Sequence, residues 1–158
     1  MKFGRFDPAQ LPELMTWFSD ARELRIWGGP EFRFPFTAAS FREDAKVDLI
    51  DSFALVAEEG ALAAFGQCYL RVGRCHFGRV GVSPRRRGQG LGTQLIREMA
   101  AWGIAGFGPR ELSLFVDKGN GAAHRLYLRL GFRDAPYPEA MPQGMDAHYM
   151  VAPREQRV

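Results

Sequence analysis

The sequence predicts one α/β domain, residues 1–158, in which a mixed sheet is flanked by helices on both faces. Three observations support this fold class. The length of 158 residues suits one domain with one hydrophobic core. A composition of 46% hydrophobic and 25% charged residues is that of an ordinary globular protein. Patterns of period two and of helical period follow one another in the order β-α-α-β-β-β-α-β-α-β-β.

The N-terminal segment predicts a strand and then a helix. Lys2–Phe6 alternates in polarity, which indicates a first strand. Asp7 and Pro8 are typical of an N-cap and a first helical position, and they predict a helix that continues to about Ala21. Apolar residues at helical spacing would form its buried face: Leu11, Leu14, Met15 and Phe18.

The next segment, Trp27–Phe36, predicts a structured loop, because glycine and proline interrupt any helical spacing. The loop carries four aromatic residues. A short second helix is expected after Thr37, through Phe41 and towards Lys46.

The rest of the chain predicts a meander followed by alternating helices and strands. Three strands joined by tight turns are expected at Ser52–Glu58, Ala61–Val72 and Cys75–Val82. The later elements are a helix over Leu91–Ile104, a strand over Glu111–Val116, a helix over Gly121–Leu130, an extended stretch from Phe132 and a last strand over His148–Ala152.

Charge and hydropathy exclude several function classes. The formal net charge is only +3, and the longest basic run, Arg85-Arg86-Arg87, has three residues. This is not the concentrated basic face that nucleic-acid binding requires, so we expect no nucleic-acid partner. No run approaches 18 apolar residues, and the N-terminus lacks the apolar core of a signal peptide. We therefore expect a cytoplasmic protein with no membrane partner.

The cysteines and histidines predict no metal site. Cys68 and Cys75 do not form a CxxC motif, and we expect two reduced, partly buried thiols. His76, His124 and His148 are scattered along the sequence without metal-ligand spacing.

A glycine-rich turn after Val82 is the strongest local signal. Pro84 ends a strand, and Gly88, Gly90 and Gly92 alternate just before a helix. Alternating glycines let backbone N–H groups approach a ligand, and a helix N-terminus adds unpaired donors, so the segment predicts an anion site. It lacks the Gly-Lys-Ser/Thr of a P-loop, and the third glycine of a dinucleotide fingerprint would fall at position 93, which is threonine. A tight strand-to-helix turn without a ligand is the alternative.

Two motifs resemble those of the GCN5-related N-acetyltransferase (GNAT) family. The first, in which a Gln or Arg precedes two spaced glycines, is matched by Arg87-Gly88-Gln89-Gly90-Leu91-Gly92 after the Val-x-Val-x-Pro of 80–84. The second is matched by Val116, Asn120, Ala123, Leu126, Tyr127, Gly131 and Phe132. The resemblance implies a GNAT fold, with the mixed central sheet splayed between its fourth and fifth strands.

The resemblance also implies a reaction and the residues that serve it. Acetyl-CoA would be the acyl donor, and a small-molecule, peptide or protein amine the acceptor, with no metal and no covalent enzyme intermediate. Backbone groups of Val80 and Val82 would pair with the pantetheine arm, and Asn120 would bond to it. The N–H groups from Arg87 to Thr93 would hold the pyrophosphate. Members of the family are often homodimers, but the oligomeric state of this chain stays open, and a non-catalytic acyl-CoA-binding module or sensor is the alternative function.

The chemistry of Tyr127 supports the role that the resemblance implies, which is beside the thioester sulfur. A thiol has a pKa of about 8.5, whereas a tyrosine hydroxyl with a pKa near 10 stays protonated at neutral pH. A tyrosine at that position can therefore give a proton to the departing thiolate. The alternative is a helix residue that packs with Leu126 and Leu130.

The general base and the acceptor pocket stay open. An amine with a pKa of about 10.4 must lose a proton before it attacks. His76, Glu31, Glu139 or water could take that proton, although His76 also fits a partly exposed strand-end residue and the glutamates fit solvated surface positions. The aromatic residues of Trp27–Phe36 would wall the acceptor pocket or, alternatively, cap the core.

Overall fold

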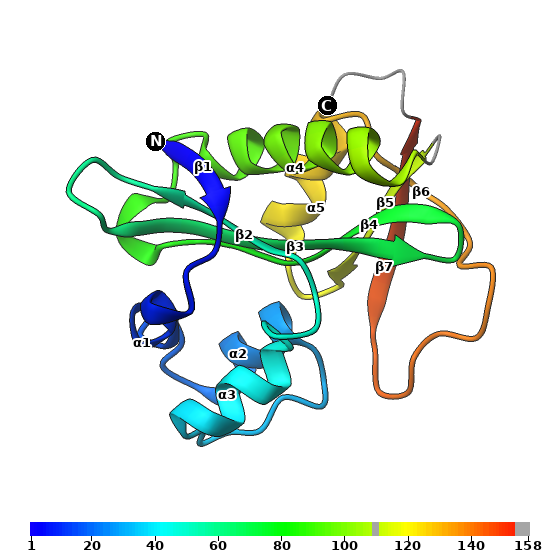
Figure 1. The fold of residues 1–158 in the computed structure, drawn as a ribbon. Helices are drawn as coiled ribbons and strands as arrows, with labels where there is room; N and C mark the ends of the chain where they lie inside the picture. The colour runs from blue at the N-terminus through cyan, green and yellow to red at the C-terminus, as the bar shows by residue number, and fades with distance from the viewer. Residues whose placement is uncertain (109–110, 154–158) are drawn as a thin grey trace.

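The computed structural model describes residues 1–108 and 111–153, and these residues are built around a seven-stranded sheet (Figure 1). The strands lie in the order β1-β2-β3-β4-β5-β7-β6. Their bounds are β1 Lys2–Arg5, β2 Ser52–Val56, β3 Leu62–Arg71, β4 Arg74–Val82, β5 Glu111–Asp117, β6 Arg133–Asp134 and β7 Ala147–Pro153. Neighbouring strands are antiparallel except β4 and β5, which are parallel. The predicted mixed sheet and its meander are confirmed, with small shifts of the strand ends.

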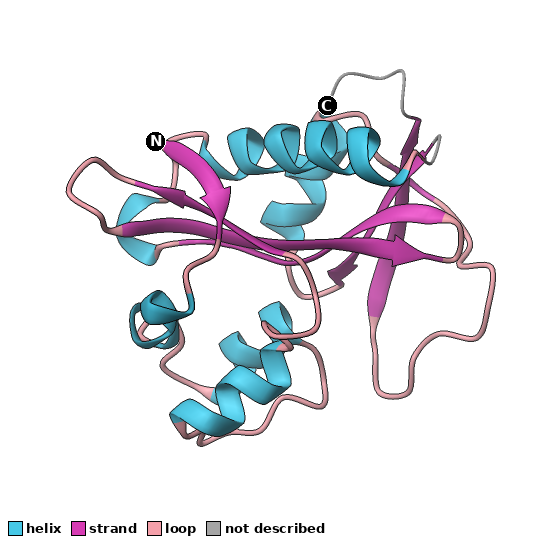
Figure 2. Ribbon diagram, in the orientation of Figure 1, coloured by secondary structure: helices cyan, strands magenta, loops and turns pink. Residues whose placement is uncertain are grey.

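Helices cover both faces of the sheet (Figure 2). Two helices, α4 (Leu91–Phe107) and α5 (Gly121–Arg129), pack on one face in the larger hydrophobic cluster. Three helices lie on the opposite face, over a second cluster: α1 (Leu11–Met15), α2 (Ala21–Gly28) and α3 (Ala38–Ala45). No helix within the described residues is long and apolar enough to cross a membrane.

The predicted helix from Pro8 to Ala21 is wrong. Pro8–Gln10 forms a 3-10 turn, and α1 then ends after five residues at Met15. Pro12 explains why the turn and α1 are separate, because in a helix from Pro8 its ring would clash with the carbonyl of Pro8 and it has no N–H to give it, whereas proline is tolerated in the first turn of α1. Asp20 then caps a new helix by accepting a hydrogen bond from the N–H of Glu23 at 2.7 Å.

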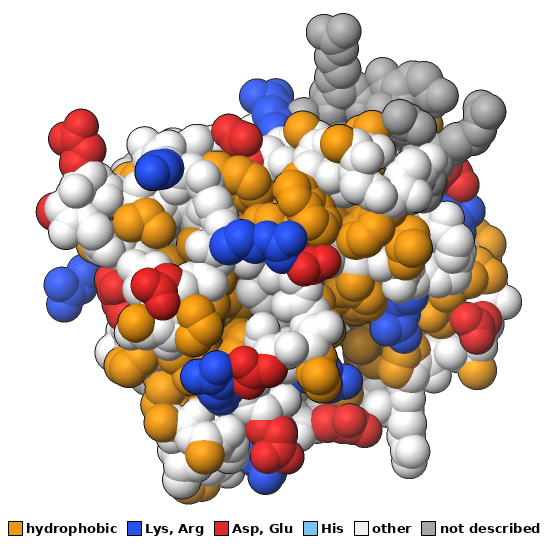
Figure 3. Space-filling view, in the orientation of Figure 1, with side chains coloured by type: hydrophobic (Ala, Val, Ile, Leu, Met, Phe, Trp, Pro, Cys, Tyr) orange, Lys and Arg blue, Asp and Glu red, His pale blue; other side chains and the backbone are white. Residues whose placement is uncertain are grey.

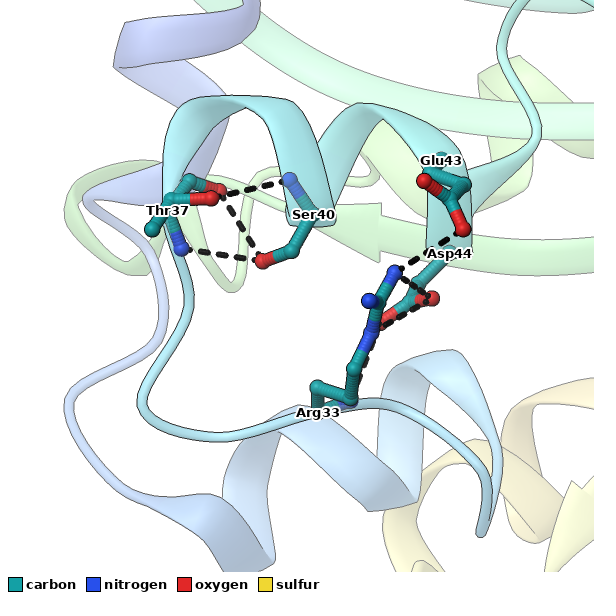
Figure 4. A network of polar contacts seen from close by, with 5 residues as sticks. All are labelled: Arg33, Thr37, Ser40, Glu43 and Asp44. Atoms are coloured by element: carbon teal, nitrogen blue, oxygen red, sulfur yellow. Dashed lines mark hydrogen bonds and ion pairs between the residues drawn. The ribbon is translucent and has the colours of Figure 1, made fainter.

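The helix α2 was not predicted, and it takes in the start of the segment expected to be a loop. Trp27 lies in the last turn of α2, and the loop begins at Gly29, whose φ of 106° ends the helix. The loop is fixed to α3 by Arg33, which donates to the carboxylate of Asp44 at 2.8 Å (Figure 4). At the start of α3, Thr37 and Ser40 form a reciprocal capping box, so the helix predicted after Thr37 is confirmed.

The helix α4 contacts the sheet closely because of Gly103. A Cβ built at this position would lie 2.4 Å from Sγ of Cys75 and 3.2 Å from Sγ of Cys68. Both thiols are fully buried rather than partly buried, and their sulfur atoms are 3.1 Å apart on neighbouring strands. Burial and the neighbouring thiol therefore leave Cys68 and Cys75 as packing residues beneath the helix.

Candidate active site

The strands β4 and β5 pair for only part of their length. Three registered pairs join them, Cys75↔Leu112, His76↔Ser113 and Phe77↔Leu114. Within the described chain, the rest of β4, Gly78–Val82, has no strand neighbour on that side. This confirms the splayed fourth and fifth strands, and it places Val80 and Val82 on an edge whose backbone groups can pair with an extended ligand.

A β-bulge interrupts β4 where the splay begins. Phe65 of β3 pairs with Gly81, and Gln67 pairs with Gly78, so two residues of β4 stand opposite the single residue between them. The first of the two is Arg79, with a left-handed φ of 48° that is uncommon for a residue with a side chain. A bulge bends its strand and increases the local twist, and the pairing of β4 with β5 ends just before it, at Phe77.

The glycine-rich turn presents an uncapped helix N-terminus. Gly88 and Gly90 have φ values of 78° and 76°, and a Cβ at either would meet no atom within 4 Å. Gly90 is the N-cap of α4 and offers no side-chain acceptor, while the first bond of the helix runs from the N–H of Gln94 to the carbonyl of Gly90 at 3.1 Å. The N–H groups of the first turn therefore face open space at the positive end of a 17-residue helix.

The third glycine has a different role. Gly92 is helical, and a Cβ there would lie 3.4 Å from Leu126 of α5 and 3.8 Å from Val82 of β4. The first turn of α4, the end of β4 and the middle of α5 therefore meet at this residue. A cavity of about 290 Å³ opens at the same helix end, lined by Gly90, Thr93, Gln94, Arg97 and Glu98.

The helix α5 carries Asn120 and Tyr127. The side-chain oxygen of Asn120 accepts a hydrogen bond from the N–H of Ala123 at 3.2 Å, so this residue is the N-cap of the helix and its amide N–H₂ group is still available. Tyr127 is buried, and its ring lies 5.9 Å from that of Phe132. Burial raises the pKa of the Tyr127 hydroxyl to about 12, so the hydroxyl is a proton donor throughout the physiological range.

A larger cavity of about 670 Å³ lies on the side of the N-terminal helices. Its walls come from α2 and the turn after it, from β4 and β5 at the splay, and from the loop before β7. None of the predicted cofactor residues lines this cavity, at least among the described positions. The cavity therefore lies on the face of the sheet that α2 covers, whereas the glycine-rich turn leads into α4 on the other face.

The candidate general bases differ in whether they line the cavity. Glu31 and Glu139 are exposed, and neither lines the cavity. His76 lines the cavity but is buried rather than partly exposed, with Nδ1 2.9 Å from Oγ of Ser113. Burial, followed by the charge of Arg71, lowers the pKa of His76 to about 3. The imidazole is therefore neutral at physiological pH and has little affinity for a proton.

The aromatic residues of the N-terminal segment divide between the cavity and the core. Trp27 lines the cavity, and its Nε1 is buried without a hydrogen-bond partner in the described part of the chain. Phe32 is buried in the second cluster, and Phe34 and Phe36 pack against that cluster. Trp27 thus both walls the cavity and packs on the core, whereas the other three only cap the core.

Two histidines that lie far apart in the sequence come together in the structure. The rings of His124 and His148 stack with 4.2 Å between their centroids, and Nε2 of His124 lies 2.9 Å from a carboxylate oxygen of Asp134. These histidines are scattered along the sequence, but the expectation that they lie apart in the structure is wrong for His124 and His148. The group links α5 to the edge formed by β6 and β7.

Comparisons with known proteins identify the fold and family. A model of the acetyltransferase (GNAT) family matches residues 11–132, well over half of the chain. The structure of a spermidine N-acetyltransferase from Vibrio cholerae in complex with CoA and spermine is similar, with a TM-score of 0.73 and 15% identity over 99% of this chain and 96% of that chain. An acetyltransferase of the GNAT family from Staphylococcus aureus Mu50 has a TM-score of 0.70 and 12% identity over 98% and 99% of the two chains.

The fold and the matched family model define the class of protein as an acyltransferase. More particularly, the chain belongs to the GNAT acetyltransferase family. The predicted family and fold are confirmed.

Proposed function

We propose that the protein transfers an acetyl group from acetyl-CoA directly to a primary amine. The observation that carries this proposal is the meeting, at Gly92, of an uncapped helix N-terminus, the splayed end of β4 and the helix that holds Tyr127. These elements bring together donors for a pyrophosphate, an open strand edge and a protonated hydroxyl. The cavity on the other side of the splay supplies room for an acceptor.

The residues present fit a CoA thioester. Open space above Gly88 and Gly90 leaves room for phosphate oxygens beside the N–H groups of 87–93. The strand edge at Val80 and Val82 suits the amide groups of a pantetheine arm, and the free amide N–H₂ group of Asn120 can donate to the same arm. The Vibrio cholerae protein binds CoA on the same fold, which supports this assignment. When bound, acetyl-CoA would supply an activated acetyl group and a thiolate leaving group.

The residues of the chain would manage the protons of the reaction. As the C–N bond to the amine forms and the C–S bond breaks, Tyr127 gives its proton to sulfur and regains one from water. The proton of the attacking amine leaves through water, because His76 has a pKa of about 3 and the two candidate glutamates lie off the cavity. A homodimer, a cytoplasmic location and the absence of a nucleic-acid partner stay predictions. On the face that Figure 3 shows, basic and acidic side chains are interspersed.

A two-stage experiment tests the proposal. Acetyl-CoA at 100 times its Kd should stabilise the protein by about 2.7 kcal/mol in a thermal-shift titration, whereas ATP and NAD should not. Release of free CoA is then followed with a broad panel of amines and peptides. An absent shift, or an equal shift with ATP, would contradict the assignment of the glycine-rich turn. A shift without turnover of any amine would favour the sensor instead.

A further inference from the structure

The larger cavity is strongly basic. Five of its lining residues carry a positive charge, and two carry a negative one. The basic residues are Arg22, Arg25, Lys46, Arg71 and Arg79, and the acidic residues are Asp117 and Asp146. They come from α2, from the end of α3, from β3, β4 and β5, and from the loop before β7. No single segment of the sequence therefore shows the excess of positive charge.

The cationic side chains of the cavity have no acidic partners. None of the five lies within 4.0 Å of a carboxylate oxygen in the part of the chain that the structure describes. Asp146, one of the two acids, already pairs with Lys118 at 3.3 Å. Elsewhere the arginines of this protein do form ion pairs: Arg33–Asp44, Arg42–Asp48, Arg74–Glu111 and Arg86–Glu59. The cavity therefore concentrates positive charge that no ion pair among the described residues neutralises, although Asp44 acts on Arg79 from a longer distance.

Two of the arginines are held rigidly with hydrogen-bonding groups to spare. Nε of Arg71 donates to the hydroxyl of Tyr137 at 2.9 Å, and its guanidinium lies 5.1 Å from the centre of the Phe115 ring. Tyr69 also hydrogen-bonds this side chain, so Arg71 is held by two tyrosine hydroxyls and by no carboxylate among the described residues, and its remaining N–H groups can bind a planar or tetrahedral oxyanion.

Arg79 is fixed by two neutral acceptors. Its Nε donates to the carbonyl of Gly28 at 3.2 Å, and Nη1 donates to the side-chain oxygen of Gln67 at 3.0 Å. Burial lowers the pKa of this guanidinium, yet an arginine stays charged at any physiological pH. This half-buried charge has only neutral hydrogen-bond partners, and Asp44 acts on it without forming an ion pair, so an anion bound in the cavity would stabilise it further.

We propose that the acceptor is an amine that also carries an anionic group, a carboxylate or a phosphate, which Arg71 and Arg79 bind within this cavity. The exposed residues Arg22, Arg25 and Lys46 attract the same anion to the cavity mouth. Asp117, which makes no ion pair among the described residues, is left to receive the ammonium end of the acceptor. This proposal rests on the proposed acetyl transfer, and it sets the chain apart from the structurally similar protein that binds spermine, a polycation.

Matched acceptors that differ only in the anion test this substrate class. Release of CoA is followed with the standard amino acids against their carboxamides, with O-phosphoethanolamine against ethanolamine, and with spermidine. We expect kcat/KM to be at least tenfold higher for the anionic member of the best pair and spermidine to be a poor acceptor. The amino-acid and phosphate arms show which oxyanion the cavity takes. Equal rates within every pair, or a preference for spermidine, would overturn the proposal while leaving the acetyltransferase assignment intact.

Variants then connect the preference to the cavity. Arg71→Gln should raise KM for the anionic acceptor at least tenfold and remove the preference within the pair, and Arg71→Lys should restore it only in part. The thermal shift with acetyl-CoA should be unchanged in both variants. Arg129→Gln, an exposed arginine in the last turn of α5, is the matched control and should behave as wild type. An unchanged preference in Arg71→Gln would overturn the role of this arginine.

A binding measurement keeps the two proposals separable. If no amine is turned over, the acetyl-transfer proposal fails, and the affinities of the same pairs for CoA-saturated protein are measured by calorimetry. At least tenfold tighter binding of the anionic member would still support an anion site in the cavity. Equal or absent binding would overturn the anion site as well.

Discussion

Replacing Tyr127 by phenylalanine is the sharpest test of the proposed chemistry, because it removes one hydroxyl and keeps the buried ring. General acid catalysis contributes about 10²- to 10⁴-fold, so kcat should fall at least about tenfold even if water partly substitutes. The affinity for acetyl-CoA should stay nearly unchanged. The hydroxyl makes no hydrogen bond to a described residue, so the free energy of unfolding at neutral pH should change by no more than about 1 kcal/mol.

The raised pKa of Tyr127 gives a second, independent prediction, which is the change in the free energy of unfolding with pH. Burial takes the pKa of the folded protein to about 12, against about 10 in the unfolded chain. Above pH 10 the unfolded chain loses this proton while the folded protein keeps it, so the free energy of unfolding must fall as pH rises. Linkage predicts that wild type loses, relative to Tyr127→Phe, about 1 kcal/mol by pH 11 and roughly 2–3 kcal/mol above pH 12.

Urea denaturation of the two proteins from pH 8 to pH 11 measures this difference, and a CoA-release assay on an accepted amine measures kcat. A Tyr127→Phe variant that turns over at the wild-type rate would show that Tyr127 is only a packing residue. Parallel stability curves up to pH 11 would show that the hydroxyl is solvated in the folded protein. Either result refutes the assignment of Tyr127 as a buried proton donor.

Three further substitutions test the site and the fold. Gly90→Val should raise the Kd for acetyl-CoA at least tenfold by calorimetry, because valine is strained at a φ of 76° and its side chain would fill the open space that we assign to the pyrophosphate; normal affinity would remove the turn from the site. Gly103→Ala should lower the free energy of unfolding in urea by about 1–3 kcal/mol, because its Cβ would lie 2.4 Å from a sulfur. Gly106→Ala on the same helix is the control: its Cβ meets nothing within 4 Å, and the free energy of unfolding should rise by up to about 1 kcal/mol. Similar values for the two variants would contradict the close packing at Gly103. Wild type should lose stability as pH falls from about 6.5 towards 3, because the unfolded chain then takes up a proton at His76 and the folded protein does not; the His76→Gln variant should lack this loss. The variant should leave the pH profile of kcat/KM unchanged near neutrality, and an altered profile would make His76 the base.

The local structure of the proposed cofactor site is predictable from sequence, because backbone groups form it over short distances along the chain. A left-handed glycine at 90, a helix that starts at Leu91 and an N-cap at Asn120 each depend on a few neighbouring residues. The break between Pro8 and Pro12 also follows from the sequence, because a proline at this distance after Pro8 prevents one continuous helix through both. Local turn chemistry therefore accounts for both the success and this error.

The acceptor side is not predictable in the same way, because side chains from distant segments form it. Arg22, Arg71 and Asp146 line one cavity although they are far apart in the chain. Their shared location depends on the order of the strands and on where β5 leaves β4, and neither follows from local pattern. The stacked pair His124 and His148 shows the same limit, since no motif spacing connects a helix to the last strand.

The bulge in β4 connects the two sides, and it does leave a trace in the sequence. Cys75 and Phe77 face the core beneath α4, and strict alternation would send the following even-numbered residues to the opposite face. Instead Val80 and Val82 pack on the α4 side, while Gly81 faces Trp27. The apolar positions change from odd to even between Phe77 and Val80, which is the pattern that one extra residue at Arg79 produces. The bulge thus lies between the open strand edge, which we propose pairs with the acyl donor, and Arg79, which lines the cavity that we propose for the acceptor, so a deletion that restored regular alternation would disturb both regions together.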